Sequence, residues 1–291
     1  MKSVQDNKIK LQGHEKFALR DGWLNKGIIT VAERPDAFQG KEGPDLFGIG
    51  NNMVKSLRYW LKAFGLVEEK AGKGALLTPL GKLIMENDPY FEDVFTIWIL
   101  HSFIAKNIHE ATSWYMFFNR MNDIEDFEKE QIEKILYREI AKYAIGQTFS
   151  ENSVKNDLDV LLSMYGKTKA KVDPEDKSVS PFAQLGLVNY SYGKYSKSHP
   201  DGRIISEWNA LYELTFLMAD TDSISIDDAV NGEMGLSRIY QITLMTANDL
   251  LDKLDALGFI RVNRTAGLDV IYKNNELTPE AIVKAYYQSR Q

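Results

Sequence analysis

The pattern of apolar and polar positions predicts a mainly helical chain with a few short strands. Its clearest segment runs from residue 51 to residue 64, where apolar side chains recur every three or four positions. Basic and amide side chains recur with the same spacing on another face, so one face is expected to pack and the other to stay on the surface. The apolar face holds Met53, Leu57, Leu61 and Phe64, and the polar face holds Asn51, Lys55, Arg58 and Lys62.

The neighbouring segments complete a motif. Residues 23–33 have helical spacing, and a loop rich in proline and glycine separates them from the helix that begins near Asn51. Gly65 is placed to end that helix, and a two-stranded hairpin is expected directly after it. Another helix is expected from Pro79. This order predicts a winged helix-turn-helix over residues 1–85.

Helical spacing also dominates residues 86–176, which we expect to form a central helical domain. The aromatic run at residues 114–118 is more typical of a core than of a ligand platform, because such rings bury large apolar areas. Residues 166–181 are polar and are predicted to form a linker. The four predicted helices are residues 92–106, 110–120, 126–145 and 153–165.

The last part, residues 177–291, repeats features of the first. Gly258 follows an amphipathic helix and precedes a strand, as Gly65 does, which predicts a second winged-helix-like domain. The predicted fold class is therefore mainly α with small β-wings. The expected elements are a strand at residues 187–195, helices at residues 207–219, 225–230, 236–243 and 247–257, and hairpin strands at residues 258–263 and 268–272.

Charge separates these parts. The 291-residue chain has a net charge of −6, which taken alone argues against a broad basic surface for nucleic acid. Residues 1–85, however, contain 14 Lys and Arg against 9 Asp and Glu, a net charge of +5, whereas residues 86–176 contain 10 against 18, a net charge of −8. A basic head on an acidic body predicts nucleic acid at one end and protein partners on the body.

The polar face of the helix that starts at Asn51 is the predicted contact with double-stranded DNA. Amide and guanidinium groups suit base edges in a major groove, and lysines suit phosphates. The corresponding helix at residues 247–257 carries three aspartates that would repel phosphates, so we assign it a structural or docking role. An ordinary solvated basic surface is the alternative interpretation. The predicted contact residues are Arg20, Asn51, Asn52, Lys55, Ser56, Arg58, Tyr59, Lys62, Lys70 and Lys73.

Signatures of enzymes are weak in this sequence. The chain has no cysteine, which excludes disulfides, zinc–cysteine sites and thiol nucleophiles. The four histidines are scattered without an HExxH pair. Asp88, Glu92 and Asp93 cluster near a helix start, where the helix dipole favours acids. We predict no resident metal or cofactor and identify no catalytic residue.

The longest apolar segment is too short to cross a membrane. Residues 96–105 are ten residues long, whereas a spanning helix needs about 20. The first residues also lack the apolar region of a signal peptide. We expect a cytoplasmic protein without a membrane partner.

Residues 13–24 read Gly-His-x-x-Phe-x-x-Arg-x-Gly-Trp-Leu, a motif with which members of an uncharacterised prokaryotic family open. The resemblance continues through residues 48–60, 77–81 and 88–93 and weakens after Tyr165. That family is similar to proteins of bacterial DNA phosphorothioation and antiphage gene clusters, and it resembles the DNA-engaging component of Ssp-type single-strand phosphorothioation systems. The resemblance implies a DNA-acting partner of a modification machine and supplies no active-site motif.

The favoured function is a DNA-binding component of such a phosphorothioation or phage-defence system. It would contact double-stranded DNA through the basic head and partner proteins, a sulfurtransferase and an ATPase, through the acidic body. One alternative is a metal-dependent DNA nickase of the same system, which would use Mg²⁺ or Mn²⁺. Another is a winged-helix transcriptional regulator, which would act as a symmetric homodimer.

Overall fold

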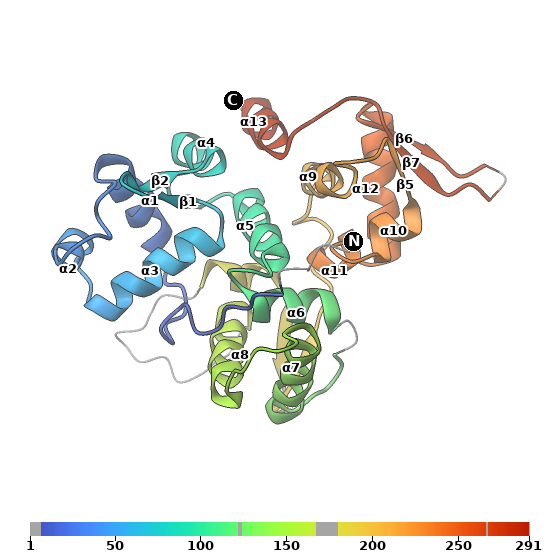
Figure 1. Ribbon diagram of the computed structural model, residues 1–291. Helices are drawn as coiled ribbons and strands as arrows, with labels where there is room; N and C mark the ends of the chain where they lie inside the picture. Colours follow the sequence, from blue (N-terminus) through green and yellow to red (C-terminus); the bar gives the residue numbers. More distant parts are fainter. Residues whose placement is uncertain (1–6, 122–123, 167–179, 266, 291) are drawn as a thin grey trace.

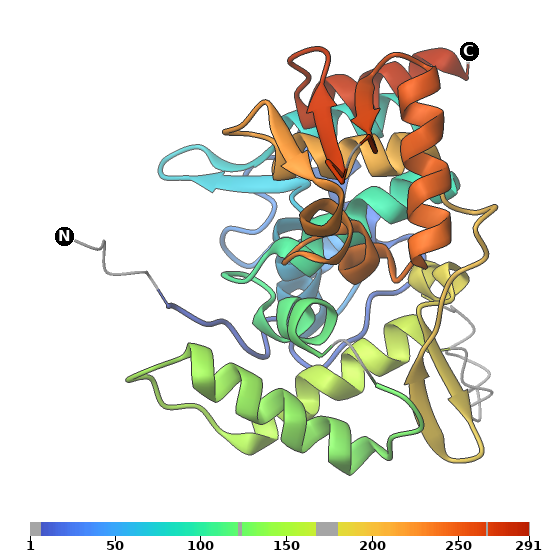
Figure 2. The same cartoon turned by 90° about the vertical axis from the view of Figure 1, so that its right-hand side faces the viewer.

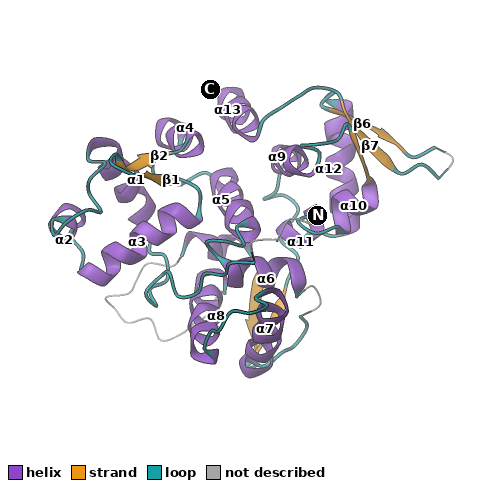
Figure 3. Ribbon diagram, in the orientation of Figure 1, coloured by secondary structure: helices purple, strands orange, loops and turns teal. Residues whose placement is uncertain are grey.

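The computed structural model describes residues 7–121, 124–166, 180–265 and 267–290. Helices occur in every part of the described chain, and its strands gather in three small antiparallel sheets (Figures 1 and 3). The mainly helical character with small β elements is therefore confirmed.

The first unit follows the predicted order of elements. It comprises α1 (Trp23–Glu33), α2 (Gly43–Phe47), α3 (Asn51–Ala63), β1 (Val67–Lys70), β2 (Gly74–Leu77) and α4 (Pro79–Asn87). The short helix α2 lies where the sequence predicted only loop, because Pro44 suits a first helical turn and Gly48, at φ 61°, ends it one turn later. Thr78 caps α4 by accepting a hydrogen bond from the Gly81 amide.

Gly74 fixes the β1–β2 hairpin against the loop that follows α1. The Ala75 amide donates a hydrogen bond to the Pro35 carbonyl, at 2.8 Å. A Cβ atom on Gly74 would lie 2.2 Å from that carbonyl oxygen, and Gly74 also has a φ of +80°. The position therefore requires glycine twice over, for its backbone conformation and for the close approach.

The four central helices are confirmed, with ends shifted by at most three residues. They are α5 (Val94–Lys106), α6 (Thr112–Arg120), α7 (Lys129–Tyr143) and α8 (Glu151–Tyr165). Ten of the 13 residues of α5 are buried, so this helix forms the centre of the molecule. The aromatic run in α6, from Trp114 to Phe118, is buried as expected of a core segment.

Residues 187–195 form a hairpin rather than the predicted single strand. After a short 3₁₀ helix, η1 (Pro181–Leu185), the strands β3 (Val188–Ser191) and β4 (Lys194–Lys197) pair around a turn at Tyr192 and Gly193. The single-strand prediction was wrong because the alternation of side-chain types along the sequence continues through this two-residue turn and so does not reveal it. The predicted linker, residues 166–181, lies mostly outside the described residues.

The last unit contains the predicted helices and hairpin and two further elements. Strand β5 joins the hairpin to give the strand order β5-β7-β6, and helix α13 follows it near the end of the chain; neither was predicted. The elements are α9 (Glu207–Leu217), β5 (Ser223–Ser225), α10 (Ile226–Asn231), α11 (Leu236–Tyr240), α12 (Leu244–Ala256), β6 (Ile260–Asn263), β7 (Val270–Lys273) and α13 (Pro279–Ser289).

One hydrophobic core extends through all three predicted parts. Helix α13 packs against both α9 and α4 and so brings the end of the chain to the first unit (Figure 1). The Tyr286 ring stacks on Phe95 of α5, with ring centroids 3.7 Å apart. The division into domains at residues 85 and 176 stays a prediction. Among the described helices, none has the length and apolar character needed to cross a membrane.

Candidate nucleic-acid interface

Helix α3 presents one exposed polar face and one buried face. Gly50 precedes it in an extended conformation, and the helix begins at Asn51 as predicted. Asn51, Asn52, Lys55 and Arg58 are exposed, and the Lys62 side chain retains 27% of its surface in solvent. These five predicted contact residues therefore lie on the accessible side of the helix.

Two predicted contact residues lie on the buried side. Ser56 is fully buried, and its hydroxyl donates to the Phe17 carbonyl. Tyr59 is 5% exposed and contacts the rings of His14 and Trp60. Their positions in the helical repeat point them at the core, so we remove both from the set of surface contacts.

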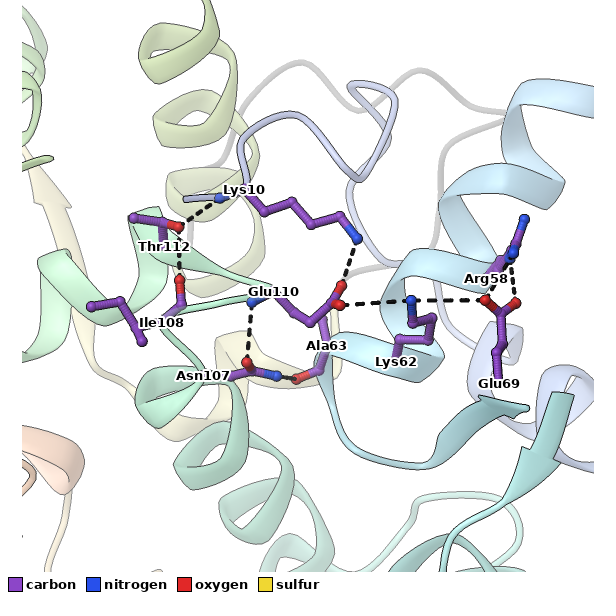
Figure 4. A network of polar contacts seen from close by, with 9 residues as sticks. All are labelled: Lys10, Arg58, Lys62, Ala63, Glu69, Asn107, Ile108, Glu110 and Thr112. Carbon is purple, nitrogen blue, oxygen red and sulfur yellow. Dashed lines mark hydrogen bonds and ion pairs between the residues drawn. The ribbon is translucent and has the colours of Figure 1, made fainter. Parts of the chain in front are cut away.

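Arg58 is held by a carboxylate from the hairpin. Its Nε and Nη2 donate to the two carboxylate oxygens of Glu69 on β1, at 2.5 and 2.8 Å (Figure 4). This bidentate contact raises the pKa of Arg58 and, through the same hydrogen bonds, lowers the pKa of Glu69. The Arg58 guanidinium is thus held against the hairpin.

Lys62 lies between two carboxylates that come from different parts of the chain. Its Nζ is 3.8 Å from Glu69 and 3.6 Å from Glu110, which precedes α6. Glu110 also pairs with Lys10 of the N-terminal segment at 2.5 Å (Figure 4). The result is a chain of alternating charges that runs along one side of α3.

Backbone contacts hold this chain of charges in place. The Asn107 side chain accepts from the Glu110 amide and donates to the Ala63 carbonyl at the end of α3. The Thr112 hydroxyl accepts from the Lys10 amide and donates to the Ile108 carbonyl (Figure 4). The loop between α5 and α6 is therefore attached both to α3 and to the N-terminal segment.

Lys55 differs from its neighbours on α3. Its Nζ contacts the Asn52 side chain at 3.4 Å, and among the described residues no carboxylate lies within ion-pair distance. Its exposed position and uncompensated charge suit a phosphate contact.

The remaining predicted residues surround this helix. Lys70 pairs with Glu68 on the outer side of β1 at 2.7 Å, and Lys73 is exposed in the turn before β2. The Arg20 guanidinium is half-buried, 5.8 Å from the centroid of the Trp23 ring. Lys70 therefore lies on the face of β1 opposite Glu69, which meets α3, and Arg20 lies beside α1.

Helix α12 shows the opposite charge arrangement. Its Asp252 accepts from Arg264, just after β6, at 2.5 Å, and its Asn248 accepts from the same guanidinium at 3.0 Å. In the first unit the helix supplies the cation and the hairpin the carboxylate; in the last unit these roles are exchanged. The exposed acids of α12 keep it unsuited to phosphate.

The N-terminal motif supports the fold rather than a reactive site. The His14 Nε2 donates to Asp157 of α8 at 2.9 Å, and Ser113 of α6 donates to the other carboxylate oxygen at 2.6 Å. Both His14 and Asp157 are buried. A Cβ on Gly13 would lie 2.3 Å from the Tyr59 ring. The Gly-His pair therefore joins the N-terminal segment to α3, α6 and α8.

In the predicted acidic cluster at the start of α5, the carboxylates of Asp88 and Asp93 accept hydrogen bonds from backbone amides. The Asp88 carboxylate accepts from the amides of Glu92 and Asp93 and from the Thr96 hydroxyl. Asp93 caps α5 by accepting from the Phe95 amide. In the described ranges, no group of three His, Cys, Asp or Glu side chains is arranged to hold a metal ion.

Sequence reasoning missed Glu69, Glu110 and Lys10, which complete the charge network of α3. A carboxylate in the hairpin was visible in the sequence, but nothing local shows which cation it meets. Lys10 and Glu110 are 100 residues apart in the chain, so only the packed structure brings them together.

Fold and site together define a mainly α protein in which two units of helices and a small hairpin flank a helical centre, with an exposed basic helix in the first. The chain belongs to the family described as "Protein of unknown function (DUF4007)", with a match over residues 11–287. A comparison with curated proteins found no match.

Two solved structures are similar to this chain over nearly its whole length. The "Magnesium ion-bound SspB crystal structure" has a TM-score of 0.84 and 22% sequence identity, and the "SspB crystal structure" has a TM-score of 0.83 and 23% identity. Each comparison covers 97% of this chain and 87% of the other. The likeness shows that the two proteins share a fold.

Proposed function

We propose that this protein is a DNA-binding component of an Ssp-type DNA phosphorothioation or phage-defence system. The observation that carries the proposal is the row of exposed amide and basic side chains on α3, next to a hairpin that exposes two lysines. Hydrogen-bond donors at this spacing fit the major groove, where Arg pairs with guanine and Asn with adenine. The row consists of Asn51, Asn52, Lys55 and Arg58.

The order of elements supports this docking mode. Helices α1 to α3 precede the β1–β2 hairpin, as in a winged helix-turn-helix, so α3 corresponds to the recognition helix and the hairpin to the wing. In this arrangement α3 enters the major groove, and Lys70 and Lys73 contact phosphates from the wing. The basic charge of residues 1–85 favours the same end of the molecule.

The assignment to a phosphorothioation system is supported by the likeness to SspB structures. In such a system the acidic residues 86–176 would face partner proteins, a sulfurtransferase and an ATPase. A net charge of −8 on this part suits basic partner surfaces. A homodimer would place two copies of α3 on one duplex.

Metal-dependent nicking is the second candidate because one similar structure is described as magnesium ion-bound. The described residues do not fit a metal centre, since they contain no suitable group of three ligating side chains. We therefore derive no metal-dependent step from this chain.

Removing the unpaired cation of α3 tests the proposal. We expect Lys55→Ala to weaken duplex DNA binding for all sequences and to reduce the slope of log affinity against log salt by about 0.9, because one phosphate contact is lost. The measurement is fluorescence anisotropy of a labelled duplex titrated at several salt concentrations.

The matched control is Lys134→Ala, which removes an exposed lysine from α7. Affinity and salt slope equal to wild type in both Lys55→Ala and Lys62→Ala would exclude α3 from the interface. Incubation of supercoiled plasmid with and without Mg²⁺ or Mn²⁺ separates binding from nicking, since only a nickase would produce open circles.

A further inference from the structure

The β3–β4 hairpin is a second surface of unusual composition. It lies at the opposite end of the molecule from the β1–β2 hairpin in the view of Figure 2. Strand β4 is fixed to the loop before α7: Phe127 and Tyr195 exchange two backbone hydrogen bonds, at 2.9 and 2.7 Å, and the Lys197 amide donates to the Ile124 carbonyl. The hairpin is thus a rigid support for the side chains it carries.

Its tip places a tyrosine where the backbone disfavours one. Tyr192 has a φ of +50° and Gly193 a φ of +82°. Positive φ at both central residues defines the two-residue hairpin turn in which Asn-Gly and Gly-Gly are preferred, because other side chains are strained there. The Tyr192 side chain is 103% exposed, so no packing within the chain offsets this strain.

The solvent face of the hairpin carries hydrogen-bond donors and no acid. The register pairs Asn189 with Ser196 and Ser191 with Lys194, which places these four side chains on one face. Tyr190 and Tyr195 pair on the other face, with ring centroids 4.6 Å apart. Residues 188–200 contain no aspartate or glutamate.

We propose that this hairpin binds single-stranded DNA, with an unpaired base stacked on Tyr192 and the adjoining phosphates on Lys194 and its neighbouring hydroxyl and amide groups. Exposed aromatic rings beside basic side chains are the general means of binding unpaired strands, because every base offers a stacking face. Paired bases within a duplex are already stacked, so the tyrosine favours unpaired DNA. A function in binding, rather than in folding, explains why a tyrosine occupies this strained position.

This contact is separate from the duplex contact proposed for α3. The two sites share no residue and lie on different elements. Failure of one in its assay therefore leaves the other standing, because the probes differ: a single-stranded oligothymidine for the hairpin and a duplex for α3.

The test uses fluorescence anisotropy of a labelled oligothymidine with the full chain. We expect Tyr192→Ala to weaken binding about tenfold, the range of a lost stacking contact, and Tyr192→Phe, which keeps a ring, to bind within about twofold of wild type. Tyr90→Ala is the matched control, since Tyr90 is another exposed tyrosine, at 68%.

A second variant separates function from stability. Tyr192→Asn installs the residue that the turn prefers, so the melting temperature should rise while oligothymidine binding falls. A lower melting temperature would show that the ring stabilises the fold and would overturn the premise. Equal oligothymidine affinity of wild type and Tyr192→Ala, or no binding by wild type, would overturn the proposal.

Discussion

At the residue scale, the surroundings of one buried histidine dictate its protonation. His101 on α5 is fully buried between the Tyr165 hydroxyl, 2.9 Å from Nδ1, and the Ile239 carbonyl, 2.7 Å from Nε2. Burial lowers the pKa of His101 to about 3. A neutral ring with the proton on Nε2 satisfies both contacts, donating to the carbonyl and accepting from the hydroxyl.

This histidine should make the protein sensitive to acid. Its folded pKa lies below the ordinary value of 6.5, so between about pH 6 and pH 4 the unfolded chain binds a proton that the folded chain does not. The free energy of unfolding should fall with decreasing pH by up to about 1.4 kcal/mol per pH unit from this group. Urea unfolding over this range measures the slope.

His101→Gln should show a shallower slope, and His109→Gln, which replaces an exposed histidine, is the matched control. An unchanged slope in His101→Gln would mean that the folded protein admits a proton at this residue. The histidine itself is visible in the sequence, but its protonation follows from partners on α8 and α11 that only folding supplies.

At the element scale, the first and last units use the same pairing of helix and hairpin with exchanged charges. Arg58 of α3 meets Glu69 of β1, whereas Asp252 of α12 meets Arg264 beyond β6. In the duplex contact proposed for α3, DNA and Glu69 would compete for one guanidinium. Because the pair is half exposed, its strength is modest and a phosphate or guanine can replace the carboxylate.

Removing this competitor should strengthen DNA binding. We expect Glu69→Gln to raise duplex affinity roughly two- to fivefold, the range of an exposed ion pair. Anisotropy with the duplex probe measures the change. Glu139→Gln on α7 removes an equal charge far from α3 and controls for net charge. A decrease in affinity would instead assign Glu69 the task of orienting Arg58.

At the scale of the whole molecule, α13 joins the last part of the chain to the first unit and to the central helix α5. Its Tyr286 stacks on Phe95 and donates to Asp93, and its Tyr287 shares a 2.6 Å hydrogen bond with Thr96. These contacts fix α13 to α5, while the helix also packs on α4 and α9. Because α13 packs on α4, α5 and α9, we expect the described parts to unfold as one unit.

Removal of the Tyr286 ring from α13 tests whether the parts unfold together. Tyr286→Ala should lower the free energy of unfolding by about 2–4 kcal/mol, as expected for the loss of a buried aromatic ring, and wild type should unfold in a single transition. Chemical denaturation followed by both circular dichroism and fluorescence measures this, with Tyr90→Ala as the exposed control. Separate transitions in wild type would support independent domains at the predicted boundaries.

The sequence by itself determined the local features of this protein. Helical spacing located α1 and α3, glycine and proline marked their ends, and segment charges separated a basic head from an acidic body. These properties depend on neighbours within a few positions, or on simple summation of charge, and so they survive without knowledge of the fold. The Gly-His motif at residues 13 and 14 was visible too, although not its purpose.

Only the tertiary structure decided which surfaces are available. It buried Ser56 and Tyr59, joined Arg58 and Lys62 to carboxylates, and folded residues 188–197 into a hairpin with Tyr192 at its tip. Each outcome depends on which distant segments meet. A helical repeat identifies two faces but not the partner that covers one of them, and a charge is identified without the counter-charge that packing places beside it.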